Sequence, residues 1–209
     1  MKDVTSWQKR KHEVDMKDVT SWCTTKHEVD MKDVTSWYRN KTKNMSMNLF
    51  FDFTVDKTNH NIHIKREFAA DRSTVWDCYT KSEILDQWWM PLPWKSKTKS
   101  MDFREGGKWH YAAVGPNGEE HWSITSYVKI EPQKMFIAND AFGDADGNIN
   151  PQLPQSQWTM NFSDMENNTL VYGIMQFSDL AQLEQIIAMG FKEGLNMAME
   201  NLDSILAKK

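Results

Sequence analysis

The chain has 209 residues, of which 40% are hydrophobic and 26% charged, and its formal net charge is −4. This length fits one globular domain of ordinary size together with an extension. No run of about eighteen apolar residues occurs, which excludes a membrane-spanning helix, and the charged N-terminus lacks the apolar segment of a secretory signal.

The charges are distributed unevenly along the chain. Residues 1–44 carry ten Lys or Arg and seven Asp or Glu, so the remainder of the chain is acidic. An acidic body argues against nucleic acid as a partner. The two cysteines, Cys23 and Cys78, stand in unrelated contexts and predict neither a disulfide nor a metal site. We therefore expect a cytoplasmic protein.

The first 44 residues contain a tandem repeat. The string MKDVTSW begins at residues 1, 16 and 31, so the period is fifteen residues. In a helix, successive repeats would rotate by about 60°, so their tryptophans would form no continuous apolar stripe. We expect residues 1–44 to lie outside the fold, disordered or weakly helical. They are interpreted as a duplicated segment, as an array of short motifs that binds a partner multivalently, or as the result of a true start at Met45 or Met47.

The remainder divides into a lead-in segment, residues 45–60, and a domain, residues 61–209. Residues 61–68 alternate in polarity, with Ile62, Ile64, Arg66 and Phe68 on one side, and predict a first strand. Two short helices follow, the first capped by Asp71 or Ser73 and the second ended by Pro91 and Pro93. A succession of six strands, typical of an antiparallel sheet, is then predicted at residues 99–105, 108–114, 121–130, 135–142, 157–163 and 169–177.

A long last helix is predicted from Asp179 onward. Its apolar residues recur at spacings of three and four as far as Ile205, which indicates one stripe about seven turns long. This stripe can cover the aromatic face of the sheet. Gly190 and Gly194 lie one turn apart within it. They either let the helix pack closely against bulky rings such as Trp158 or leave a gap for a ligand.

Two turns decide which side chains face this helix. Five of the ten tryptophans lie in the stretch 88–122, which contains both turns. If Gly115 opposes Gly118 across the Pro-Asn-Gly turn, Tyr111 pairs with Trp122 and Trp109 with Ile124, all on one face of the sheet.

The other turn, Gly106-Gly107, leaves two registers open. A tight turn would put Asp102 and Arg104 on the inner face, where they would form a paired polar anchor. One bulged residue would put Met101 and Phe103 there instead, because a slip of one residue reverses every side chain. We favour Met101 and Phe103, since buried unpaired charges are costly.

Several strings resemble one known family. REFAADRSTVWDCYT is similar to its opening strand and first helix, EILDQWWMPLPW to its second helix, and MDFREGGKWHY and VGPNGEEHW to its next two turns. Over about residues 60–207 the chain resembles the START-like (SRPBCC) superfamily, in the branch named after the activator of the ninety-kilodalton heat-shock chaperone's ATPase. The resemblance implies an α+β helix-grip fold, in which a curved antiparallel sheet of about seven strands wraps around a long C-terminal helix.

The resemblance also implies a cavity between the sheet and the last helix, where many members bind apolar small molecules. Our candidates for its lining are Trp88, Phe103, Trp109, Tyr111, Trp122, Trp158, Met160, Phe177, Gly190, Phe191 and Gly194. Possible polar anchors are Asp102, Arg104 and Asp140. The loop 143–156 is a candidate lid over the cavity mouth.

The sequence predicts no cofactor and no metal. The run from Asp144 to Asn150 imitates the start of a calcium loop, but Ile149 stands where that loop needs glycine. We expect a non-catalytic accessory or stress-related protein that binds an apolar or aromatic small molecule. Two alternatives stay open, an activator of a chaperone ATPase and a cyclase- or hydrolase-type enzyme on the same fold. Nothing in the sequence indicates the oligomeric state.

Overall fold

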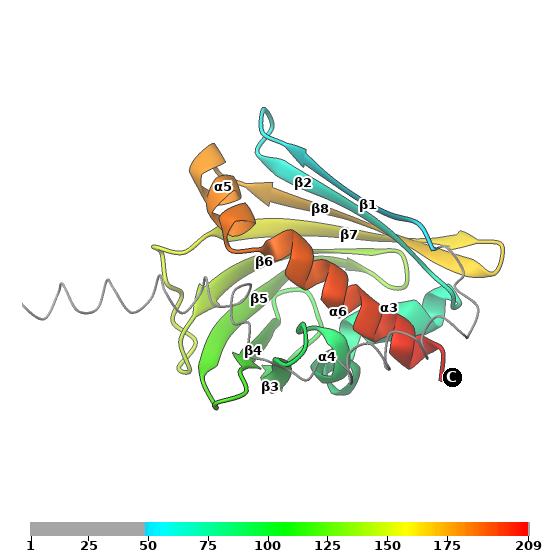
Figure 1. The fold of residues 1–209 in the computed structure, drawn as a ribbon, viewed down its shortest axis with the longest axis horizontal. Coiled ribbons are helices and arrows are strands. Elements are labelled where there is room, and N and C mark those ends of the chain that lie inside the picture. The colour runs from blue at the N-terminus through cyan, green and yellow to red at the C-terminus, as the bar shows by residue number, and fades with distance from the viewer. Residues whose placement is uncertain (1–48, 209) are drawn as a thin grey trace, which may run out of the picture.

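The computed structural model describes residues 49–208, so the predictions made for the tandem repeat lie outside the described residues. The fold is α+β, with one antiparallel sheet curved around a C-terminal helix (Figure 1). The sheet has eight strands in the order β1-β2-β8-β7-β6-β5-β4-β3. The predicted helix-grip architecture is therefore confirmed, with one strand more than expected.

The last six strands form a meander, and the hairpin of the first two strands extends the sheet beyond the last one. The strands are β1 Phe51–Asp56, β2 Asn61–Phe68, β3 Lys95–Met101, β4 Lys108–Val114, β5 Glu120–Glu131, β6 Met135–Gly143, β7 Gln155–Met165 and β8 Asn168–Phe177. Consecutive strands pair with each other from β3 to β8, and β2 then pairs with β8. The prediction for residues 99–105 is wrong, because β3 begins and ends four residues earlier and residues beyond Met101 form the turn.

The additional strand comes from the lead-in segment. In β1, Phe51, Phe53 and Val55 pack against the core, and the strand pairs with β2 along its whole length. Its alternation of apolar and polar residues is that of a half-buried strand. The lead-in segment thus supplies one edge of the sheet.

Four helices are described, α3 Arg72–Thr80, α4 Ser82–Trp88, α5 Leu180–Ala188 and α6 Phe191–Leu206. Two of them begin at a capping aspartate, which satisfies a backbone N–H that has no partner inside the helix. Asp71 accepts from the Thr74 N–H at 2.9 Å, and Asp179 accepts from the Gln182 N–H at 2.9 Å. Within the described residues, no helix is both long enough and apolar enough to span a membrane.

The prediction of one continuous last helix is wrong. The chain breaks at Gly190, which has φ +79° and lies between α5 and α6 as the N-cap of α6. This left-handed conformation suits glycine, which has no Cβ to clash with the backbone. The break lets α5 lie at the end of β8 while α6 crosses the concave face of the sheet (Figure 1).

An aromatic cluster fills one part of the space between helices and sheet. The Trp76 ring makes edge contacts with Phe103 at 5.8 Å, Phe136 at 6.1 Å and Phe162 at 5.1 Å between ring centroids. Such edge-to-face pairs add to the stabilisation from burial. On the inner side of β7, Met160 and Phe162 are buried and Trp158 packs against the core.

The turn between β4 and β5 has a register that differs from the predicted one. The Gly115 N–H donates to the Glu119 carbonyl at 2.9 Å, so the turn is one residue longer than expected. Tyr111 therefore pairs with Ser123, and Ala112 pairs with Trp122. Because a shift of one residue reverses the faces, Trp122 lies on the outer side, 4.9 Å from the His110 ring. The prediction that Trp122 faces the last helix is wrong.

At the Gly-Gly turn the favoured register is confirmed. Met101 pairs with Trp109, and Met101 and Phe103 pack against the core. The side chains of Arg104 and Asp102 are 70% and 54% exposed and form an ion pair with each other at 2.7 Å.

Candidate functional site

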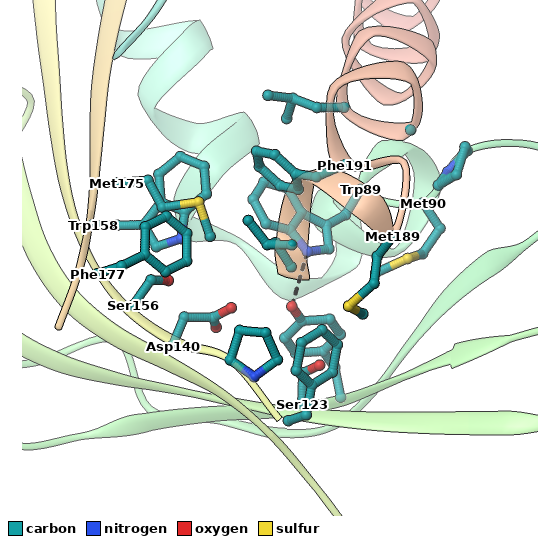
Figure 2. Close-up of a pocket in the computed structure, with 17 residues that line it drawn as sticks. Trp89, Met90, Ser123, Asp140, Ser156, Trp158, Met175, Phe177, Met189 and Phe191 are labelled. Atoms are coloured by element: carbon teal, nitrogen blue, oxygen red, sulfur yellow. Dashed lines mark hydrogen bonds between the residues drawn. The ribbon is translucent and has the colours of Figure 1, made fainter. Parts of the chain in front are cut away.

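A cavity of about 120 Å³ opens between the sheet and the junction of α5 with α6 (Figure 2). Its walls come from five strands, the segment after α4 and both C-terminal helices. It is lined by Trp89, Met90, Pro91, Tyr111, Ser123, Asp140, Phe142, Pro154, Ser156, Trp158, Met175, Phe177, Ile186, Met189, Phe191, Gly194 and Leu195. The lining is therefore largely apolar, with a small polar group on the sheet.

The polar group is positioned by the registers of β5, β6 and β7. Asp140 of β6 lies opposite Ser156 of β7 and opposite Thr125 of β5. Ser123 of β5 lies opposite Phe142, two residues further along β6. Since alternate residues of a strand share a face, Asp140 and Phe142 both point inward. Figure 2 shows Asp140 directed into the cavity, with Ser156 on one side and Ser123 on the other.

Asp140 is the only ionisable carboxyl among the described residues that line the cavity. Its Oδ1 accepts a hydrogen bond from Thr125 Oγ1 at 2.6 Å, and no other hydrogen bond to this carboxyl is formed within residues 49–208. Burial raises the pKa of Asp140 to about 6, against the opposing effect of the Thr125 hydrogen bond. Asp140 is half-buried and lines the cavity.

Tyr111 forms a second polar point beside Asp140. Its hydroxyl accepts a hydrogen bond from Trp89 Nε1 at 3.1 Å, and its ring stacks on Trp109 with centroids 3.8 Å apart. Burial raises the pKa of Tyr111 above its ordinary value, with a smaller contribution in the same direction from Asp140. Tyr111 is therefore a neutral hydroxyl at physiological pH, able to donate or accept a hydrogen bond.

Aromatic and thioether side chains make the apolar walls. Trp158 of β7 meets Phe191 of α6 edge to face, with ring centroids 6.0 Å apart. Met90, Met175 and Met189 contribute three flexible side chains. Thioether chains adapt to irregular shapes, so these walls can adjust to an occupant.

Two smaller spaces adjoin the cavity. One, of about 40 Å³, shares Trp89, Asp140 and Trp158 with it, and another, of about 10 Å³, shares Trp89, Trp158 and Leu195. Both indoles thus line all three spaces.

Six of the predicted site residues line the cavity. They are Tyr111, Trp158, Phe177, Phe191, Gly194 and the predicted polar anchor Asp140. Trp109 and Met160 line the adjoining 40 Å³ space instead. Gly190 forms the junction between α5 and α6 but does not line the cavity.

The remaining predicted residues lie elsewhere. Trp88 is buried in the core and donates from Nε1 to the Cys78 carbonyl at 2.9 Å. Phe103 packs between Trp76, Tyr127 and Phe136. Trp122 lies on the outer face of the sheet, and Asp102 and Arg104 lie exposed at the hairpin, so none of the three reaches the cavity.

Sequence reasoning missed much of the lining, including Trp89, Met90, Ser123, Phe142, Ser156, Met175 and Met189. The alternation of side chains along a strand could have predicted some of them. Ser156 shares a face with Trp158, and Phe142 shares a face with Asp140. Met90 and Met189 lie outside regular elements, where no periodicity applies.

The loop between β6 and β7 borders the cavity through Pro154. Its Asp144 carboxylate accepts from the N–H groups of Asp146 and Asn148, each at 2.9 Å, and so stabilises the turn itself. At the end of the loop, the Gln155 N–H donates a hydrogen bond to Gln182 Oε1 of α5 at 2.8 Å. Nowhere in the described part of the chain do three or more His, Cys, Asp or Glu side chains gather as metal ligands.

Comparisons with known proteins agree with this architecture. A protein from Arthrobacter aurescens, solved by NMR, is 27% identical with a TM-score of 0.71, over 76% of this chain and 92% of its own. A protein from Staphylococcus epidermidis is 26% identical with a TM-score of 0.66, over 74% and 94% of the two chains. Ms6760 from Mycobacterium smegmatis, at 24% identity and a TM-score of 0.70 over 77% and 98%, shares the fold.

No curated protein matches the chain. The model of the family described as Activator of Hsp90 ATPase homolog 1-like protein matches residues 69–207, which is most of the domain. This range runs from the end of β2 through α6 and contains every residue that lines the cavity. The chain therefore belongs to the Activator of Hsp90 ATPase homolog 1-like family.

Proposed function

We propose that this protein binds a small apolar or aromatic molecule in the cavity beneath the α5–α6 junction. The observation that carries the proposal is the cavity itself, an apolar space of about 120 Å³ with one carboxyl and a few hydroxyls on its sheet side. Protein interiors are normally packed with few voids larger than a water molecule. An apolar space with a few convergent polar groups is typical of a ligand site.

The volume sets the size of the occupant. An engineered apolar cavity of about 150 Å³ binds benzene. The present cavity therefore suits a ligand of about one ring. A larger ligand would need the adjoining 40 Å³ space, which Trp89 and Trp158 also line.

Methionine NMR tests the proposal with an internal control. With methyl-labelled methionine, we expect toluene or indole to shift the Met175 and Met189 signals, because both residues line the cavity. Met165 and Met197 are exposed, at 46% and 44%, and their signals should stay in place. Gly194→Leu, which puts a side chain into the cavity, should abolish the shifts. Absence of shifts at Met175 and Met189, or equal shifts at all four residues, would refute ligand binding in this cavity.

Activation of a chaperone ATPase is a second candidate, favoured by the family to which the chain belongs. The measurement is the ATPase rate of the Hsp90 chaperone with and without this protein. An increase that survives the cavity-filling substitution Gly194→Leu would assign activation to another surface. An unchanged rate would reject this candidate.

A catalytic role is a third candidate, favoured by a raised carboxyl pKa inside a cavity. Perturbed carboxyl groups of this kind serve as general acids or bases in many enzymes. Turnover of a cyclic or ester substrate that disappears in Asp140→Asn would support it. Turnover that is unchanged in Asp140→Asn would reject Asp140 as the catalytic group.

A further inference from the structure

The carboxyl of Asp140 faces the cavity, and no cation of residues 49–208 lines this cavity with it. None of the described residues that line the cavity is a Lys, Arg or His. One carboxylate oxygen accepts from Thr125 at 2.6 Å, and the other accepts no hydrogen bond from residues 49–208. An isolated ionised carboxyl removed from water is costly unless a partner compensates it.

The groups that face Asp140 from each neighbouring element leave this charge uncompensated. Tyr111 on β4 and Tyr127 on β5 are the titratable ones, and burial raises the pKa of both, so they are neutral. Ser156 faces it from β7, and the lining residues of α5 and α6 are apolar or glycine. Burial raises the pKa of Asp140 only to about 6, so the carboxyl is ionised above neutral pH.

The walls around this carboxyl also suit a cation. Trp89, Trp158, Phe177 and Phe191 surround the space that Asp140 enters, as Figure 2 shows. The faces of aromatic rings attract cations, most strongly those of Trp. Hydroxyl oxygens of Ser123 and Ser156, on either side of Asp140, can accept further N–H groups from a bound ammonium.

We propose that the cavity selects small organic cations, amines carried on about one ring, with Asp140 as their counter-ion. This inference rests on the proposed function, because it names the class of ligand for the same cavity. The ammonium group would lie against the free oxygen of Asp140 and the ring among Trp89, Trp158 and Phe191. A carboxylate or phosphate ligand would be disfavoured, since it would bring like charge to Asp140.

A matched pair of ligands tests the selectivity. Benzylamine and benzyl alcohol share one ring and nearly the same size, but only the amine is a cation near neutral pH. At about pH 8 we expect benzylamine to bind at least about tenfold more tightly than benzyl alcohol. A hydrogen bond between charged groups is stronger than one between neutral groups by about this factor. Binding is followed by calorimetry and by the shifts of the Met175 and Met189 methyl signals.

The substitution Asp140→Asn should remove the preference for the amine, and a lower pH should reduce it. In Asp140→Asn the two ligands should bind about equally, whereas Asp102→Asn, which removes an exposed carboxyl, should leave the preference intact. At about pH 5, where the carboxyl of Asp140 is protonated in the free protein, the preference should shrink.

Three outcomes would overturn the inference. Equal affinity for both ligands in the unsubstituted protein, or a preference that persists in Asp140→Asn, would overturn the selectivity for cations while leaving ligand binding in place. If neither benzylamine, benzyl alcohol nor toluene shifts the cavity methyl signals, the proposed function fails together with the inference.

Discussion

Two carboxylates face the space between α6 and the sheet, and they differ in their partners. Asp203, near the end of α6, forms an ion pair with Arg66 of β2, whose guanidinium also donates to the Leu49 carbonyl at 3.2 Å. Asp140, near the beginning of α6, has a neutral donor and an open cavity in front of it. The C-terminal end of α6 is thus held to the sheet by an ion pair, whereas its N-terminal end borders the cavity.

The two ends of α6 therefore differ in how much they contribute to stability. A paired carboxylate holds α6 against β2, and its removal would leave a cation uncompensated. The uncompensated carboxylate of Asp140 and the internal Gly194 each make the other end less stable than it need be. Such features gathered at one cavity are typical of a binding site.

The largest effect should follow from breaking the Arg66–Asp203 pair. The side chains of Arg66 and Asp203 are 11% and 26% exposed, so Arg66→Met removes the cation from a largely buried ion pair. We expect the free energy of unfolding to fall by about 3 kcal/mol in urea titrations.

The double variant Arg66→Met/Asp203→Leu is the control. It replaces both charges with apolar groups and should recover most of the loss. A loss of less than about 1 kcal/mol in the single variant would show that this ion pair does not fasten the helix.

At the N-terminal end of α6, Asp140→Asn removes the carboxylate charge. This substitution should stabilise the protein, and the gain should depend on pH. The pKa of Asp140 is raised from an ordinary 3.8 to about 6, so the folded state holds the proton more tightly than the unfolded state. The stability contributed by the protonated carboxyl is present below pH 3.8 and is lost as the pH rises through 6. Between about pH 4.5 and 8, the unsubstituted protein should therefore lose about 2 kcal/mol of unfolding free energy relative to Asp140→Asn.

Unfolding free energies of both proteins, measured across that pH range, give the difference directly. Other carboxyl groups titrate alike in the two proteins and cancel. A constant difference would mean that the Asp140 carboxyl is not desolvated.

The two glycines near the cavity should respond to alanine in opposite directions. Gly190→Ala places a Cβ at φ +79° and should cost about 1 kcal/mol. Gly194→Ala lies within α6 and should gain up to about 1 kcal/mol from helix propensity. Thermal unfolding of both variants is the measurement. A gain at both positions would contradict the break between α5 and α6.

The smallest effect is expected at the exposed ion pair of the hairpin. Asp102 and Arg104 are the same residue types as the buried pair, but water screens them. Asp102→Asn should change the unfolding free energy by less than about 0.5 kcal/mol. A larger change in urea titrations would place this pair in a less solvated position.

Strong periodicity made much of the fold predictable from the sequence. The alternation in residues 61–68 predicted β2 with its buried side, including Arg66, and Asp179 predicted the start of the first C-terminal helix. Periodicity could not reveal the break at Gly190, because the apolar spacing continues across it. The φ of one residue separates the two helices.

The site was predictable only in part, because it depends on registers. One additional residue in the Gly115 turn turned Trp122 outward and brought Ser123 inward. Asp140 could be named as a candidate, but its neighbours Thr125 and Ser156 come from two other strands. The described lining contains no cation, but its residues come from many separate segments of the chain. Local sequence patterns therefore could not predict this absence.

The carboxyl carbon of Asp140, followed by NMR through a pH titration with and without benzylamine, provides the most direct measurement. We predict a midpoint near 6 in the free protein and a lower midpoint when the amine is bound, because a cation stabilises the ionised form. A midpoint near the ordinary 3.8 in the free protein, unmoved by the amine, would contradict both the uncompensated charge and its role in binding.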